Sequence, residues 1–144
     1  GFYLDDISLQ TSSTAVSGNG NSGITQEVAD ERYLGIEYKG IPQVSKSVAY
    51  TTVLTDAGKH ILHPAADNNA RTFTIAANSS VAYPIGTAIT FINMINTVTI
   101  AINSDSLTLM GAGTTGSRTL AANGIATAVK ISSTAWVISG TNLS

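Results

Sequence analysis

The only two histidines of the chain are the first residues to test for chemistry. His60 and His63 lie in the stretch Lys59-His60-Ile61-Leu62-His63-Pro64. On a helix, residues three positions apart share a face and could bind one metal ion. Pro64 and the apolar residues predict a strand instead, and an odd spacing on a strand directs the two rings to opposite faces. Because no third ligand is evident, we expect no metal site and no cofactor.

Three aspartates of the C-terminal part are the next candidates: Asp56, Asp67 and Asp105. Two carboxylates that face each other across a groove can hydrolyse a glycosidic bond. However, Asp67 and Asp105 fall in turn clusters, where Asp commonly hydrogen-bonds to its own backbone. No Gly-x-Ser-x-Gly motif marks a nucleophilic serine. We therefore predict no catalytic residues, and a small glycan-degrading enzyme is a minor alternative.

Glycine motifs and aromatic residues give two further hypotheses. The segments Gly18–Gly23 and Gly111–Gly116 both match Gly-x-Gly-x-x-Gly. A dinucleotide site also needs a strand before the motif, a helix after it and an acidic residue about 20 positions on, so we predict loops instead. Aromatic side chains could form a platform for a sugar, and the candidates by residue type are Tyr50, Tyr83 and Trp136.

The composition limits the class of protein. Only 11% of the 144 residues are charged, against roughly 25% in ordinary domains, and the net charge is -2. This balance argues against a nucleic-acid partner, and the 43% of hydrophobic residues argues against disorder. There is no cysteine for a disulfide scaffold and no apolar run long enough for a membrane span. Since charge normally keeps copies apart, so low a charge favours self-association.

Three segments differ in composition. Residues 1–23 contain no Lys or Arg and end in a tract rich in Gly, Ser and Asn, which predicts an extended N-terminal anchoring arm and linker. Residues 24–46 hold much of the charge and predict one short helix, from about Gln26 to Leu34, followed by a connector. Such a helix is too short to be stable alone and must pack against something.

Residues 47–144 alternate apolar and polar side chains with a period of two, which is typical of β-strands. Turn signals separate the short runs, so we predict an antiparallel β-sandwich or a jelly-roll-like domain. Asn123-Gly124 is predicted to form a two-residue hairpin turn, and Ser132-Ser133-Thr134 a second hairpin. The expected centre of the core consists of Phe73, Phe91 and Trp136.

Two stretches resemble phage virion proteins. Val28-Ala29-Asp30-Glu31-Arg32-Tyr33-Leu34-Gly35 is similar to an Ala-Asp-x-Arg-Tyr-Leu phrase that recurs before the distal domains of phage fibres. The stretch from Leu54 to the C-terminus, with Pro84-Ile85-Gly86-Thr87 and Trp136-Val137-Ile138-Ser139-Gly140, resembles a small β domain of phage head fibres, decoration proteins and tail-fibre tips. The resemblance implies a phage virion structural protein that forms homotrimers and has no enzymatic activity.

These observations lead to one main hypothesis and, besides the glycan-degrading enzyme, to two alternatives. We expect a capsid decoration or head-fibre protein on the virion surface, bound to the major capsid protein or another virion protein through Phe2, Tyr3, Leu4 and Ile7. The oligomer interface is expected to include Val28, Tyr33 and Leu34. The first alternative is a tail-fibre tip module that recognises a host surface glycan. The second is an adhesive β domain of a non-viral cell surface.

Overall fold

The computed structural model describes residues 40–144. Several predictions concern the preceding segment and lie outside these residues: the extended arm, the short helix, the anchoring residues Phe2, Tyr3, Leu4 and Ile7, and the interface residues Val28, Tyr33 and Leu34. The C-terminal compact unit begins at Ile41, before the position 47 that the composition suggested. The fold is therefore described for this unit alone.

Strands make up most of the described residues, which confirms the all-β class. One 3-10 turn, Leu54–Asp56, is the sole helical element among residues 40–144. The strands are β1 (Gln43–Ser45), β2 (Tyr50–Thr51), β3 (His60–His63), β4 (Arg71–Ile75), β5 (Ala88–Asn93), β6 (Thr97–Ile102), β7 (Ser106–Leu109), β8 (Arg118–Ser132) and β9 (Ala135–Leu143).

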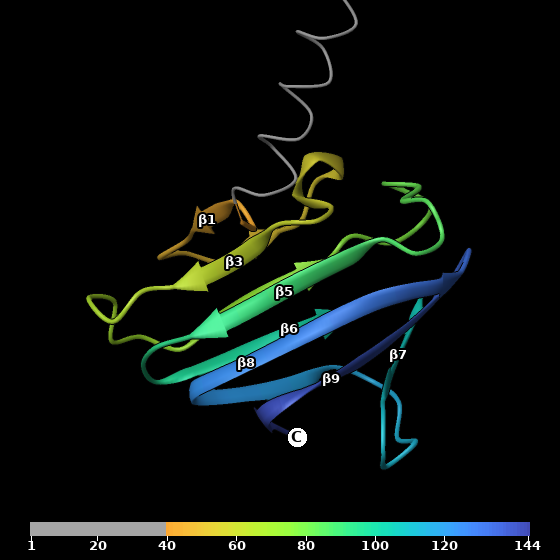
Figure 1. The fold of residues 1–144 in the computed structure, drawn as a ribbon. Helices are drawn as coiled ribbons and strands as arrows, with labels where there is room; N and C mark the ends of the chain where they lie inside the picture. Colours follow the sequence, from red (N-terminus) through yellow and green to blue (C-terminus); the bar gives the residue numbers. More distant parts are fainter. Residues whose placement is uncertain (1–39) are drawn as a thin grey trace, which may run out of the picture. The chain divides into compact units, whose positions relative to one another are not determined.

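The first six strands wind as a two-sided coil. β1, β3 and β5 pair side by side in parallel in one layer, while β2, β4 and β6 do the same in the other. The chain thus alternates between the layers, and each strand pairs with the strand two positions away in sequence (Figure 1). We call these the odd layer and the even layer. Such stacking is like that of a β-solenoid.

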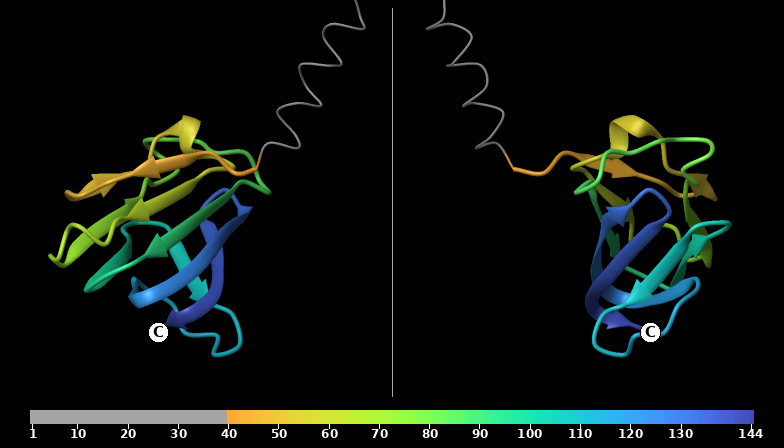
Figure 2. Two further views of the ribbon diagram at one scale, coloured as in Figure 1. Left: turned by 60° about the vertical axis from the view of Figure 1, so that its left-hand side comes forward. Right: turned by 90° about the vertical axis from the view of Figure 1, so that its right-hand side faces the viewer.

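The long strand β8 closes one end of this coil. Its first part pairs with β6 of the even layer, and its later part pairs with β5 of the odd layer, both in the antiparallel direction. β9 runs antiparallel to β8, and β7 runs parallel to β9. Figure 2 shows β8 bending sharply as it passes from one layer to the other. The edges of both layers at this end are therefore covered by strand pairing.

The predicted antiparallel sandwich or jelly roll is wrong in its strand directions. All pairs within the coil are parallel, and only the pairs of β8 are antiparallel. The alternation of apolar residues sets which side of a strand is buried, and it is the same for both directions. The direction of pairing depends instead on how the strands are connected. β5 and β6 are close in sequence, yet they belong to different layers and do not pair with each other.

Of the two predicted hairpins, one is wrong and one is confirmed. β8 continues through Asn123-Gly124 without a turn, and Asn123 has a φ of 62°. The pairing register with β9 shifts between Leu120 and Ile125, so this segment is a bulge that allows β8 to bend. The second hairpin is present, since Ser132 pairs with Ala135 where β8 turns into β9.

The core lies between the two layers and contains the three predicted aromatic residues. Phe73 and Phe91 are fully buried, and Trp136 is 1% exposed. The ring of Trp136 meets that of Tyr83 edge-to-face, with the centroids 5.5 Å apart. This geometry is the favoured one for aromatic pairs. Because Tyr83 and Trp136 are both buried, they cannot form the sugar platform considered from the sequence.

Candidate functional site

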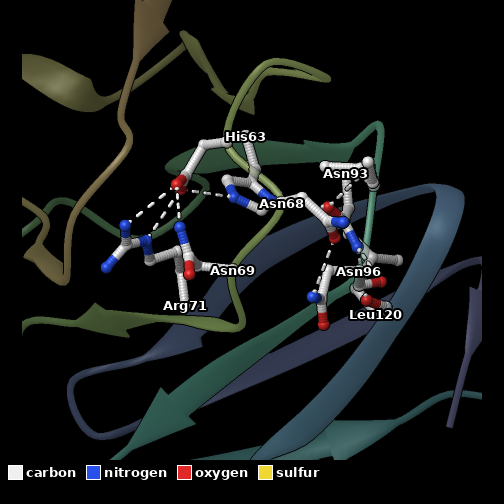
Figure 3. A network of polar contacts seen from close by, with 9 residues as sticks. His63, Asn68, Asn69, Arg71, Asn93, Asn96 and Leu120 are labelled. Carbon is white, nitrogen blue, oxygen red and sulfur yellow. Dashed lines mark hydrogen bonds and ion pairs between the residues drawn. The ribbon is translucent and has the colours of Figure 1, made fainter.

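A polar network joins both layers at one end of the coil (Figure 3). His63 ends β3 and Arg71 begins β4, while Asp67 lies in the loop between them. The parallel register places Asn93, at the end of β5, beside His63. The winding of the coil therefore gathers side chains that are far apart in sequence.

His63 is fully buried, and both of its ring nitrogens have a partner. Nδ1 lies 2.7 Å from Oδ1 of Asn93, and Nε2 lies 2.9 Å from Oδ2 of Asp67. The Asn93 amide nitrogen donates to the carbonyls of Asn96 and Leu120, which orients its oxygen towards the histidine. His63 consequently has no free nitrogen for a metal ion or a substrate.

The carboxylate of Asp67 is the centre of this network. It accepts hydrogen bonds from Nε and Nη2 of Arg71 at 2.7 and 2.9 Å, and from Asn69 at 2.6 Å. The hydrogen bonds from Arg71 in particular, and then that from Asn69, hold the pKa of Asp67 well below its usual range. In turn, Asp67 raises the pKa of Arg71. A carboxylate held ionised in this way is a poor proton donor at neutral pH.

A second polar cluster surrounds the 3-10 turn. The hydroxyl of Tyr50 donates to Oδ2 of Asp56 at 2.6 Å, and the backbone N–H of Val53 donates to the same oxygen at 2.9 Å. Burial and the neighbouring Asp56 raise the pKa of Tyr50 to about 12. Asp56 is only 2% exposed, so its carboxylate is held inside the fold.

Lys130 is buried in the core, and the sequence analysis missed it. Its ammonium donates to Oδ1 of Asn78 and to the carbonyl of Tyr83, each at 2.8 Å. Asp105 accepts a hydrogen bond from the backbone N–H of the same Asn78. These contacts fix the long loop between β4 and β5 on β8. The signal was present, because Ala126, Ala128 and Lys130 share one side of a strand.

The three candidate aspartates do not form a pair. Asp56 precedes β3, Asp67 follows it, and Asp105 follows β6. Within residues 40–144 no hydrogen bond joins two of them, and no group of three His, Asp or Glu side chains could hold a metal ion. Each accepts hydrogen bonds that support the fold. Asp56 accepts from the nearby backbone N–H of Val53, and Asp67 accepts from side chains within four positions of it. Asp105 accepts from the backbone N–H of the distant Asn78, so neither Asp67 nor Asp105 makes the local backbone contact that we predicted.

The segment Gly111–Gly116 is a loop between β7 and β8, as expected. Gly111, Gly113 and Gly116 all have positive φ, which is the conformation that glycine adopts most easily. Arg118 folds back over this loop and donates to Oγ1 of Thr114. The segment thus has neither the helix nor the acidic residue of a dinucleotide site.

The outer surface of the odd layer carries aliphatic side chains. In the register, Leu62 of β3 lies beside Ile92 of β5, which lies beside Ile125 of β8. A second row contains Val129 of β8 beside Val137 of β9. We define the aliphatic face by the six large outward side chains Leu62, Ile92, Ile125, Val129, Ile131 and Val137.

The outer surface of the even layer is different. Its outward positions are mostly hydroxyl side chains, with Thr72 beside Thr99 and Thr99 beside Thr119. We define the threonine face by Thr51, Thr72, Thr74, Thr97, Thr99 and Thr119. No outward strand position of either face holds Lys, Arg, Asp or Glu. The low charge of the chain is therefore visible as two uncharged outer faces.

No helix in the described part of the chain is both long and apolar enough to cross a membrane. Comparison with models of protein families, with curated proteins and with solved structures gave no match.

Proposed function

We propose that this chain is a non-enzymatic virion structural protein, namely a capsid decoration or head-fibre protein of a phage. Its residues 1–23 attach to the capsid, and its β domain projects outward as part of a homotrimer. The sequence support is the resemblance of Val28–Gly35 and of Leu54–Ser144 to segments of phage fibre and decoration proteins.

The observation that carries the proposal is that the ionisable side chains of the β domain hydrogen-bond to other parts of the same fold. Asp56, Asp67 and Lys130 each hydrogen-bond within the fold, and His63 has both ring nitrogens occupied. An active site needs an acid, a base or a nucleophile that is free to meet a substrate. Groups that are committed to holding loops and layers together instead support a structural role.

The construction of the domain supports the same role. A coil of parallel strands closed by β8 is a stiff unit, and its two broad outer faces carry no charge. Neutral faces suit contact with other protein surfaces better than the recognition of a charged ligand.

Binding to capsids tests the proposal. We expect a chain lacking residues 1–23 to remain a folded oligomer but to stop co-sedimenting with particles that lack the protein. The matched variant keeps the length of the arm and replaces Phe2, Tyr3, Leu4 and Ile7 with Ser. We expect it to lose binding equally, because the apolar side chains supply the contact. Undiminished binding by either variant would contradict the anchoring role.

An activity assay tests the non-enzymatic part independently. The purified full chain is incubated with host surface polysaccharide, and the release of reducing ends is measured. We expect no release above that from a heat-denatured sample. Release that disappears in Asp67→Asn or Asp105→Asn would overturn the proposal in favour of a glycan-degrading enzyme.

A further inference from the structure

We propose that the aliphatic face is the surface through which the β domain packs against other copies of this chain. The inference rests on the proposed homotrimer and assigns the β domain's own part in it. The other outer surface, the threonine face, is then the one in contact with water. Four observations on the two faces carry this assignment.

The first observation is the chemical contrast between the faces. Both cover the same coil, and both have the same alternation of inward and outward side chains. Nevertheless, the odd layer directs Leu, Ile and Val outward where the even layer directs Thr. Ile125 and Ile131 remain 46% and 54% exposed in the single chain. Burying such side chains is favourable, and leaving a row of them in water is not.

The second observation is that two pairs of polar side chains on the odd layer's outer surface are hydrogen-bonded to each other. Thr90 and Thr127 lie side by side between the two aliphatic rows, and their hydroxyls are 2.9 Å apart. Near the edge of the layer, Nε2 of His60 lies 3.0 Å from Oε1 of Gln43. Removing water from polar groups that already have hydrogen-bond partners costs less free energy than removing it from unpaired groups. In contrast, no hydrogen bond joins two hydroxyls of the threonine face.

The third observation is charge. No outward strand position of the aliphatic face is Lys, Arg, Asp or Glu. A neutral face does not repel a copy of itself, and it offers nothing to attract a charged partner. Another copy of the same face is therefore its electrostatic match. In a cyclic trimer the contacts are heterologous, so one part of the face on each copy meets a different part of the same face on its neighbour.

The fourth observation is the size of the face. The odd layer continues through β8 into β9 and β7, which gives six neighbouring strands. With strands about 4.8 Å apart and about 20 Å long, the face covers on the order of 500 Å². In a cyclic trimer each face is divided between two neighbours, so this surface contributes about 500 Å² to each contact, and the predicted interface residues Val28, Tyr33 and Leu34 add to it.

Single cysteines test the inference in the full chain, which contains no cysteine of its own. Ser139→Cys places a thiol on the aliphatic side of β9, and Thr72→Cys is the matched control on the threonine face. Both positions are exposed, and both substitutions are nearly isosteric. With a short bismaleimide at low protein concentration, we expect at least tenfold more covalent dimer from Ser139→Cys than from Thr72→Cys. Equal yields, or the reverse order, would overturn the inference.

A second pair of variants tests the same surface without a cross-linker. Val129→Lys adds a charge to the aliphatic face, and Thr99→Lys adds one to the threonine face; both positions lie on strands flanked on both sides. We expect Val129→Lys to lower the association constant at least tenfold in sedimentation equilibrium, and Thr99→Lys to leave it unchanged. Circular dichroism confirms that each variant is folded. The two cysteine variants change the side chain very little, so we expect both to fold. They test the inference even where a lysine variant does not fold.

The outcomes separate this inference from the proposed function. An oligomer in solution that gives no cross-link at Ser139→Cys refutes the aliphatic face as the interface and leaves the homotrimer standing. A chain that is monomeric at every concentration refutes the homotrimer itself. Attachment to particles is measured separately, through residues 1–23, and depends on neither result.

Discussion

A few polar side chains, buried or half-buried, connect the strands of the coil to its loops. His63, Asp67 and Arg71 connect two strands of different layers through one carboxylate. Lys130 similarly connects β8 to the loop before β5. In each case a charged or titratable side chain hydrogen-bonds to a loop that strand pairing does not hold. Buried polar groups need such partners, because water cannot reach them.

Asp67 gives a prediction at this scale. Its lowered pKa means that its contribution to stability is fully present above the ordinary carboxyl pKa, near 4, and is lost as the pH falls towards its folded value. We therefore expect Asp67→Asn to melt at a lower temperature than the parent at pH 7. The gap should narrow as the pH falls below about 4. Thermal denaturation between pH 7 and pH 2 measures it.

The matched control for this experiment is Lys59→Gln, which changes a charge outside the network. Its difference in melting temperature from the parent should not shrink at low pH in the same way. A gap for Asp67→Asn that is constant over the whole range would show that the carboxylate charge does not stabilise the fold.

At the scale of elements, β8 closes one end of the coil, and β9 pairs with β8. β8 serves both layers, and it does so by bending at a bulge near Asn123. β9 packs so closely on it that Gly140 has no room for a side chain. A Cβ at this position would collide with the carbonyl oxygen of Ile125 and would lie 2.6 Å from Cα of Ala126. The close approach, rather than an unusual backbone angle, is what requires glycine here.

Gly140→Ala tests this close approach. Because the new methyl group meets backbone atoms rather than a flexible side chain, β9 must move away from β8. We expect the free energy of unfolding to fall by about 3 kcal/mol. Urea denaturation measures it, with Ser139→Ala as the control that should change stability by less than about 0.5 kcal/mol. A stability of Gly140→Ala equal to that of the control would show that the strands separate easily.

At the scale of the whole molecule, charge is unevenly divided along the chain. Residues 1–40 contain six acidic and two basic residues, a net charge of -4, whereas residues 41–144 contain three acidic and five basic residues, a net charge of +2. The sum is the -2 of the chain. None of the charge of the β domain lies on the outward strand positions of its two faces. Association through such a face depends on apolar burial rather than on ion pairs.

The salt dependence of association follows from this arrangement. Salt screens attraction between exposed opposite charges, but it does not weaken apolar contacts. We expect the association constant of the full chain to remain the same or rise between 50 and 500 mM NaCl. Sedimentation equilibrium at both concentrations measures it. A tenfold fall at the higher concentration would indicate an interface held by ion pairs and would contradict the aliphatic face.

How far the sequence predicts the fold differs between features. The alternation of residues such as those around Phe73 and Phe91 correctly gave strands and a core, because burial repeats every two residues on any strand. The same alternation does not distinguish strand directions, and the direction predicted for the coil was wrong. The Asn123-Gly124 pair gave a false hairpin. An Asn-Gly pair suits a tight turn, but Asn also tolerates the positive φ of a bulge, and the local sequence does not distinguish the two.

The candidate site was predictable only in part. Odd spacing correctly separated His60 from His63, since the spacing fixes the two faces of one strand. The partners of His63 could not be predicted, because Asn93 reaches it only through the parallel register of β3 and β5. The role of Lys130 was likewise hidden, because its acceptors belong to a loop that is distant in sequence.

The sequence by itself determined the all-β character of residues 47–144, the three aromatic residues at the centre of the core and the scarcity of charge, since each depends on residue type and local spacing. Only the tertiary structure decided that successive strands alternate between two layers. That alternation divides the outward side chains into an aliphatic face and a threonine face, and it brings His63 beside Asn93. The physical reason is that strand pairing joins residues through hydrogen bonds between distant backbones, and these depend on the path of the chain rather than on any single stretch of it.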